Sequence, residues 1–196
     1  MRKCILFLLA LVIWIPQASA QTAWQVAPGR SSINFKVKHL VLFHVKGKFR
    51  KFEGKVVTPD ENFANAHIEA TIRVNSIYTG NRDRDRHLLG EDFFCADEFP
   101  EIIFKSKSTV KTGENTYKIT GDLTIRGITK PIELKAKYGG QKKLSSGQAR
   151  VDFKATGSLN RFDYGLRWNE VMETGKAVVG KTVEITLKIA LLKENE

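Results

Sequence analysis

Hydrophobic and polar residues alternate along most of the chain after residue 30. In eight stretches, apolar or small residues occupy every second position and polar residues lie between them. Successive side chains of a β-strand point to opposite faces, so this period of two indicates strands with one buried and one solvated face. The eight stretches are 33–37, 52–56, 68–74, 102–108, 117–125, 132–138, 151–157 and 183–191.

One-sided strands predict an antiparallel sheet, because a parallel sheet covered on both faces would show continuous apolar runs. Arg126-Gly127 and residues 113–115 have the composition of hairpin turns, and Gly139-Gly140 predicts the start of a longer loop that runs through Gly147. Eight such strands can close into a barrel or form two packed sheets, and the periodicity leaves both open. An eight-stranded barrel could hold one small ligand.

Small residues recur on the predicted buried face. They either let two backbones approach or leave space inside the fold. These positions are Gly54, Ala70, Gly121, Ala136, Ala155 and Gly157.

Residues 79–99 break the alternation and predict a short helical insert. Asn81 can cap the start of a helix and Gly90 can end it. We expect four apolar residues to dock this insert onto the sheet. They are Leu88, Leu89, Phe93 and Phe94.

The first twenty residues have the features of a secretory signal peptide. Arg2 and Lys3 precede an apolar run at 5–15, and the small residues 18–20 form a cleavage motif. The apolar run is shorter than the roughly 20 residues that a membrane-spanning helix needs. We therefore expect cleavage of residues 1–20, export to the periplasm, and a mature single domain at 21–196.

The chain is basic, with 32 Lys and Arg against 21 Asp and Glu. Removing Arg2 and Lys3 leaves 30 against 21, a net charge of +9. These charges are spread singly, which favours a solvated basic exterior over a nucleic-acid interface. A module that binds anionic polymers or membrane surfaces through this exterior is the alternative. In the mature chain Cys95 would be the lone cysteine, and we expect a free, partly buried thiol.

Sequence signals for catalysis or metal binding are absent. His39, His44, His67 and His87 show no zinc-ligand spacing, and there is no nucleophile elbow, phosphate-binding loop or dinucleotide fingerprint. We expect no metal and no enzymatic activity, with an enzyme acting on a lipophilic substrate as the less favoured alternative. By contrast, Phe35, Phe104, Tyr117 and Phe153 share the buried face with the small residues, which suits an apolar ligand.

Several ordered motifs resemble those of one family. They are Ser32-Ile33-Asn34-Phe35-Lys36-Val37-Lys38-His39-Leu40, Val45-Lys46-Gly47-Lys48-Phe49, Ser76-Ile77-Tyr78-Thr79-Gly80-Asn81, Arg84-Asp85-Arg86-His87-Leu88, Gly121-Asp122-Leu123-Thr124-Ile125-Arg126-Gly127-Ile128-Thr129-Lys130-Pro131 and Asn160-Arg161-Phe162-Asp163-Tyr164-Gly165-Leu166. On these motifs the chain resembles the YceI-like family of lipocalin-like, polyisoprenoid-binding bacterial periplasmic proteins. The resemblance implies an all-β, eight-stranded antiparallel barrel with an elongated apolar channel. It also implies a polyprenyl or ubiquinone-like lipid as ligand, with no catalysis and no other cofactor.

Two groups of residues form the predicted binding site. The expected channel wall comprises Phe35, Val37, Ile72, Phe104, Leu123, Leu134 and Phe153, and the expected head-group site comprises His39, Asn81, His87 and Arg161. Transport, storage and sequestration of the lipid remain alternatives, and so does transient contact with the inner membrane. A homodimer is a further alternative, because a nine-residue strand spans only roughly 30 Å and a long lipid tail could exceed one barrel.

Overall fold

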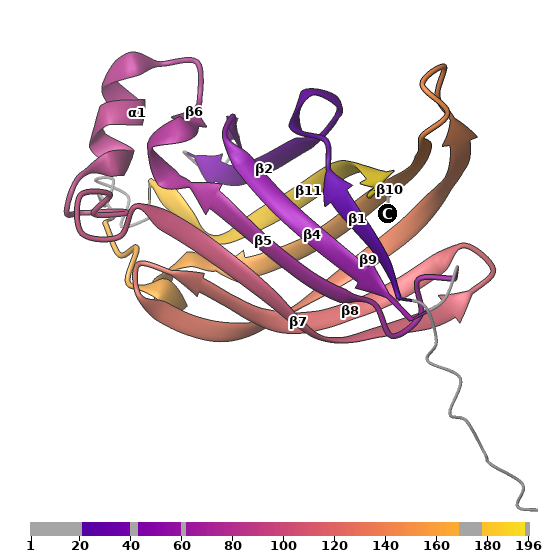
Figure 1. The fold of residues 1–196 in the computed structure, drawn as a ribbon. Helices are drawn as coiled ribbons and strands as arrows, with labels where there is room; N and C mark the ends of the chain where they lie inside the picture. Colours follow the sequence, from indigo (N-terminus) through magenta and orange to yellow (C-terminus); the bar gives the residue numbers. More distant parts are fainter. Residues whose placement is uncertain (1–20, 40–42, 60–61, 169–177, 195–196) are drawn as a thin grey trace, which may run out of the picture.

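A computed structural model describes residues 21–39, 43–59, 62–168 and 178–194 as a β-structure with one α-helix (Figure 1). The predicted signal peptide at 1–20 lies outside the described residues. Within the described ranges, no helix has both the length and the apolar character that crossing a membrane requires.

The strands belong to a single antiparallel sheet. Their bounds are β1 Thr22–Val26, β2 Ser32–His39, β3 Phe43–Phe49, β4 Phe52–Thr58, β5 His67–Arg73, β6 Ile77–Tyr78, β7 Glu101–Gly113, β8 Thr116–Ile125, β9 Ile128–Lys143, β10 Ala149–Asn160 and β11 Val179–Lys193. The remaining elements are the helix α1 Arg82–Leu89 and three short 3-10 turns, η1 Pro28–Arg30, η2 Val74–Ser76 and η3 Arg161–Tyr164.

The sheet closes on itself as an eight-stranded barrel. The ring runs β1-β4-β5-β7-β8-β9-β10-β11, and the pairing of β1 with β11 closes it. This closure confirms the predicted barrel and rules out two separate sheets. The ring of strands therefore surrounds the interior (Figure 1), and the predicted apolar side chains of these strands line it.

Two of the barrel's chain segments are interrupted, which is why the structure has more strands than the alternation predicts. β2 continues the line of β1 along β11 beyond η1, since β1 pairs with residues 191–193 and β2 with residues 179–188. In the same way β3 and β4 follow each other, with β3 paired to β2 and β4 paired to β1. The sequence prediction missed β1, β3 and the two-residue β6.

The expected loop at Gly139-Gly140 is wrong, because β9 continues through both glycines to Lys143. The register changes there: Tyr138 pairs with Phe153 and Gln141 pairs with Val151, so two glycines lie opposite Asp152. Gly140 has φ of +100°, which is open to glycine and rare for other residues. The glycine pair thus forms a β-bulge that bends a long strand.

The other local predictions are confirmed. Ile125 pairs with Ile128 across a two-residue turn, in which Arg126 and Gly127 have φ of 51° and 70°. Asn81 is the N-cap residue of α1, and its side chain accepts a hydrogen bond from the backbone N–H of Arg84 at 2.9 Å. Gly90 is the C-cap residue. The four expected apolar residues of the insert pack into the core.

The barrel has two dissimilar ends. One end carries α1, the paired residues His39 and Phe43, the Arg126-Gly127 turn and residues 161–168, and we call it the helix end (Figure 1). The opposite end, which carries residues 62–66, the β7–β8 turn and the β9–β10 loop, is the far end. Each end has its own cluster of buried apolar side chains.

Two glycines on the buried face allow close approach between neighbouring strands. A Cβ atom at Gly121 would lie 2.4 Å from the carbonyl oxygen of Lys105, and one at Gly157 would lie 2.6 Å from a methyl group of Leu134. Atoms of the neighbouring strands therefore occupy the space beside these two glycines. Ala70, Ala136 and Ala155, by contrast, line the interior cavity.

We expect Gly121→Ala to lower the free energy of unfolding by about 1–3 kcal/mol, because the β7 backbone must shift to admit the methyl group. Urea unfolding followed by circular dichroism measures this change. Gly29→Ala is the control, since a Cβ atom there would meet nothing within 4 Å. An equal, small effect of both substitutions would contradict the close approach.

Candidate functional site: an apolar cavity and its polar end

A cavity of about 560 Å³ occupies the barrel interior. Its wall is built almost entirely from the inward-facing apolar side chains of the strands, including residues from both core clusters. The period-two pattern places these side chains, because closing the sheet turns one face of every strand inward. A cavity of this size and character falls in the range that binds lipophilic small molecules.

The structure brings ten of the eleven predicted site residues to the cavity. They are Phe35, Val37, His39, Ile72, His87, Phe104, Leu123, Leu134, Phe153 and Arg161. Asn81 is the exception: its side chain caps α1 and it does not line the cavity. The sequence made Asn81 a candidate through its polarity, but the orphan N–H groups of the helix start engage its oxygen instead. The contact of the other ten residues with a ligand stays a prediction.

The far end of the cavity is closed by Phe63. This ring is 5% exposed and packs against Trp24, Phe153 and Tyr138, with ring centroids 5.2, 5.1 and 6.4 Å away. Its segment is anchored to the barrel wall, because the Thr109 hydroxyl donates to the carbonyl of Ala66 at 2.9 Å. The cavity is therefore blind at this end.

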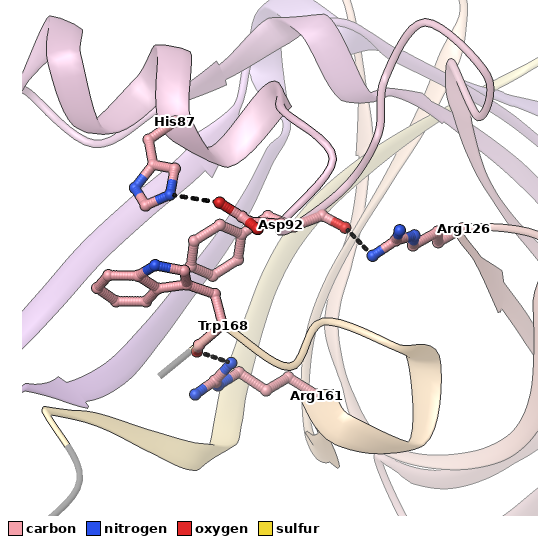
Figure 2. Close-up of polar contacts among 6 residues, drawn as sticks. His87, Asp92, Arg126, Arg161 and Trp168 are labelled. Atoms are coloured by element: carbon pink, nitrogen blue, oxygen red, sulfur yellow. Dashed lines mark hydrogen bonds and ion pairs between the residues drawn. The ribbon is translucent and has the colours of Figure 1, made fainter. Parts of the chain in front are cut away.

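The helix end gives the cavity its contact with the surface, because Asp83 and His87 line the cavity and are exposed. Figure 2 shows the imidazole of His87 beside the indole of Trp168. The ring centroid of His87 lies 5.0 Å from Trp168 and 5.1 Å from Phe93, both edge to face. His87 Nε2 also lies 3.4 Å from a carboxylate oxygen of Asp92. The rings form an aromatic rim with one titratable group.

Arg161 is the most deeply buried charged group of the described residues, at 3% exposure. Its guanidinium donates hydrogen bonds to four backbone carbonyls, those of Leu166, Trp168, Val179 and Gly180. Burial lowers the pKa of Arg161, but an arginine begins so far above neutrality that it stays charged. Within the described ranges no carboxylate pairs with Arg161, so carbonyl dipoles and the ring of Phe162, whose centroid lies 4.5 Å from the guanidinium carbon, stabilise its charge at the edge of the cavity.

The rim is tied to the barrel by further polar contacts. Arg126 donates to the carbonyls of Phe93 and Gly165, each at 3.1 Å, and so joins the helical insert to the segment after β10. Figure 2 shows the first of these contacts as a dashed line from Arg126. At the start of α1, a carboxylate oxygen of Asp85 accepts hydrogen bonds from the backbone N–H and the hydroxyl of Thr79, at 2.8 and 2.6 Å. These contacts hold the rim against the strands.

Most side chains that line the site are apolar, and most of the charged ones lie near the helix end. Among the described residues, no three His, Cys, Asp or Glu side chains lie close enough together to hold a metal ion. Cys95 is free and partly buried, as expected, and its sulfur lies 3.8 Å from a carboxylate oxygen of Glu98. The cavity offers an apolar surface along its length and polar groups at one end.

Sequence reasoning missed several of the residues that shape this site. Phe63 and Trp168 lie in loops, where strand periodicity assigns no face, and Phe93 was expected to dock the insert but not to line the cavity. A large aromatic residue between the turn-forming residues Asn62 and Asn65 was the available signal for Phe63. No pattern pointed to Arg126 as a link between segments, because its partners are backbone carbonyls.

Comparison with known proteins agrees with this geometry. The UPF0312 protein SA2479 of Staphylococcus aureus strain N315 is 38% identical over 155 residues, which cover 79% of this chain and 88% of that protein. The crystal structure of a Campylobacter jejuni YCEI protein is 30% identical, with a TM-score of 0.64, over 81% of this chain and 90% of that one.

Two more distant structures share the fold. BcnA of Burkholderia cenocepacia has a TM-score of 0.73 at 22% identity, over 84% of this chain and 98% of that one. A domain of Saccharophagus degradans, described as polyisoprenoid binding and implicated in plant cell wall breakdown, has a TM-score of 0.67 at 16% identity, over 88% of this chain and 99% of that one.

The fold and cavity define a lipocalin-like barrel with a blind apolar interior. The YceI-like domain matches residues 24–191, nearly the whole described barrel. The chain belongs to the YceI-like family, as its motifs predicted.

Proposed function

We propose that this protein binds a long isoprenoid lipid, of the polyprenyl or ubiquinone-like kind, inside the barrel. The observation that carries the proposal is the blind cavity of about 560 Å³ with an almost wholly apolar wall. Burying each CH₂-sized unit of a lipid tail contributes about 0.8 kcal/mol. A tail of several isoprene units can therefore bind tightly without polar contacts.

An empty cavity of this size would also lower the free energy of unfolding. In protein cores the free energy lost grows with void volume, and a void of this size corresponds to a loss on the order of 10 kcal/mol. That is comparable with the net stability of an ordinary domain. An apolar occupant restores the lost contacts, which favours a permanently or frequently filled barrel.

The lipid would enter with its tail toward Phe63 and its head at the helix end. His39, His87 and Arg161 are the polar residues from the predicted head-group set that line the cavity there. The aromatic rim of Trp168 and Phe93 would pack beside the first isoprene units. The description of the Saccharophagus degradans domain supports an isoprenoid rather than a straight-chain lipid.

The role is carriage, storage or sequestration without catalysis. The N-terminal sequence supports export to the periplasm after cleavage before Gln21, and mass spectrometry of the mature N-terminus tests it. Strands of up to sixteen residues are longer than the nine on which the idea of a shared dimeric channel was based. The homodimer remains a prediction that sedimentation velocity can check.

Native mass spectrometry of protein purified from a bacterial periplasm without detergent is the test of the proposal. We expect a stoichiometric adduct, which organic extraction releases as a polyprenyl compound. The control is the same protein after delipidation, which should take up added prenols or quinones again. A ligand-free mass, together with refusal of added prenols and quinones, would overturn the proposal.

A further inference from the structure

The β2–β3 hairpin carries exposed aromatic residues and positive charge at the helix end, with Phe43 on the cavity side of the strands and the lysines on the outer side. Phe43, at the first position of β3, is 65% exposed, the largest exposure among the large hydrophobic residues of the described ranges. It pairs with His39, which lines the cavity, so it lies at the helix end beside the cavity opening. A single exposed phenylalanine means little by itself. Its surroundings give it significance.

The two strands of this hairpin, β2 and β3, contain no acidic residue. From Ser32 to Phe52 the sequence contains only cationic charges, and these are Lys36, Lys38, Lys46, Lys48, Arg50 and Lys51. Lys36 lies directly opposite Lys46, and Lys38 lies opposite His44. Like charges in such cross-strand pairs destabilise a sheet. Among the described residues, only Lys36 in this group has an acidic partner, Glu184 at 2.9 Å.

Tyr78 extends this surface along β6. Its ring is 39% exposed, and the guanidinium of Arg50 lies over it at 3.7 Å from the centroid. The ammonium of Lys48 lies 5.9 Å from the same centroid. Tyrosine with a neighbouring cation is suited to the boundary between water and lipid, because the ring is apolar and its hydroxyl is polar.

We propose that the β2–β3 surface docks the helix end of the barrel onto an anionic lipid bilayer. This surface comprises Phe43, on the cavity side at the edge of the opening, and the outer-side residues Lys38, Lys46, Lys48, Arg50 and Tyr78. The lysines and Arg50 would bind lipid phosphates, and Phe43 would enter the boundary between head groups and acyl chains. Docking in this position brings the cavity opening next to the lipid surface. A lipid could then pass between bilayer and barrel with little exposure to water.

The basic exterior elsewhere provides a matched comparison. Lys118 and Lys135, like Lys38 and Lys46, are exposed lysines on neighbouring strands, but they lie on β8 and β9, away from Phe43. Reversing this pair changes the net charge by as much as reversing Lys38 and Lys46. A bilayer attracted only by net charge would respond equally to both changes, whereas a docking surface would not.

Vesicle sedimentation with the mature protein tests the proposal. The vesicles contain either phosphatidylcholine alone or phosphatidylcholine with phosphatidylglycerol, and no isoprenoid. We expect binding to the anionic vesicles that falls in high salt. The double substitution Lys38→Glu with Lys46→Glu should weaken it at least about tenfold, and Lys118→Glu with Lys135→Glu should weaken it much less.

Phe43→Ser isolates the apolar contribution, with Val110→Ser as its control because Val110 is 46% exposed near the far end. We expect Phe43→Ser to weaken binding about fivefold and Val110→Ser to leave it unchanged. Equal effects of the two charge reversals, no binding to anionic vesicles, or indifference to Phe43→Ser would each overturn the proposal. Binding to a soluble polyanion that equals vesicle binding and ignores Phe43→Ser would assign the surface to polymers instead. Since no isoprenoid is present, none of these outcomes bears on the ligand proposed for the cavity.

Discussion

Replacing Arg161 by methionine is expected to lower the free energy of unfolding by about 3 kcal/mol or more. The guanidinium donates to four backbone carbonyls from two segments, residues 166–168 and 179–180. Methionine fills part of the volume but donates no hydrogen bond, so these carbonyls lose their partner in a buried setting. Urea unfolding, with the midpoint and the slope fitted separately, measures the loss.

Two further variants make the Arg161 result specific. Arg167→Met removes the same type of side chain from an exposed position in the same segment and should change stability by less than about 0.5 kcal/mol. Arg161→Lys keeps the charge but not the planar arrangement of donors, and should recover only part of the loss. If Arg161→Met were no more destabilising than Arg167→Met, the four hydrogen bonds would not anchor the helix end.

Ile185→Trp is expected to abolish lipid binding while leaving the fold intact. Ile185 lines the cavity, between Phe35 on β2 and Gly157 on β10. Adding a large side chain to a filled core costs stability, but here the indole can extend into the cavity of about 560 Å³ and gains contacts there. The space for an isoprenoid tail is reduced, and each CH₂-sized unit displaced removes about 0.8 kcal/mol of binding.

Lys188→Trp is the control for this substitution. Lys188 is exposed on the same strand, so the new tryptophan places the same indole outside the barrel. Binding of a fluorescent prenol and thermal unfolding are measured for both variants. We expect at least about a hundredfold weaker binding for Ile185→Trp, an unchanged affinity for Lys188→Trp, and melting temperatures close to that of the parent for both. Undiminished binding by a folded Ile185→Trp protein would place the lipid outside the barrel.

The alternation of residue types decided more of this fold than any motif. A period of two fixes which side of a strand is buried regardless of what it packs against, so the inward set that includes Phe35, Phe104 and Phe153 could be read directly from the sequence. Local chemistry was equally informative for the turn at Arg126-Gly127 and for the capped helix α1. In each case the deciding interactions lie within a few residues of one another.

Local sequence patterns did not predict the interrupted strands or the bulge. Gly139 and Gly140 read locally as the start of a loop, and only the pairing of β9 with β10 keeps them inside a strand. β1 is five residues long and could not be recognised without its partners β4 and β11. A local sequence pattern carries no information about pairing between distant segments. These elements could therefore be identified only from the closed sheet.

The same distinction between local sequence and tertiary structure applies to the candidate site. The sequence by itself determined the apolar wall and a basic exterior, because both follow from residue type and alternation. Only the tertiary structure decided which end of the barrel is closed, through Phe63, and which polar residues reach the cavity. It placed His87 and Arg161 at the helix end, because long-range packing of the helical insert and of the segment after β10 sets their positions. It also showed that Asn81, whose capping role the local sequence predicted, does not reach the cavity.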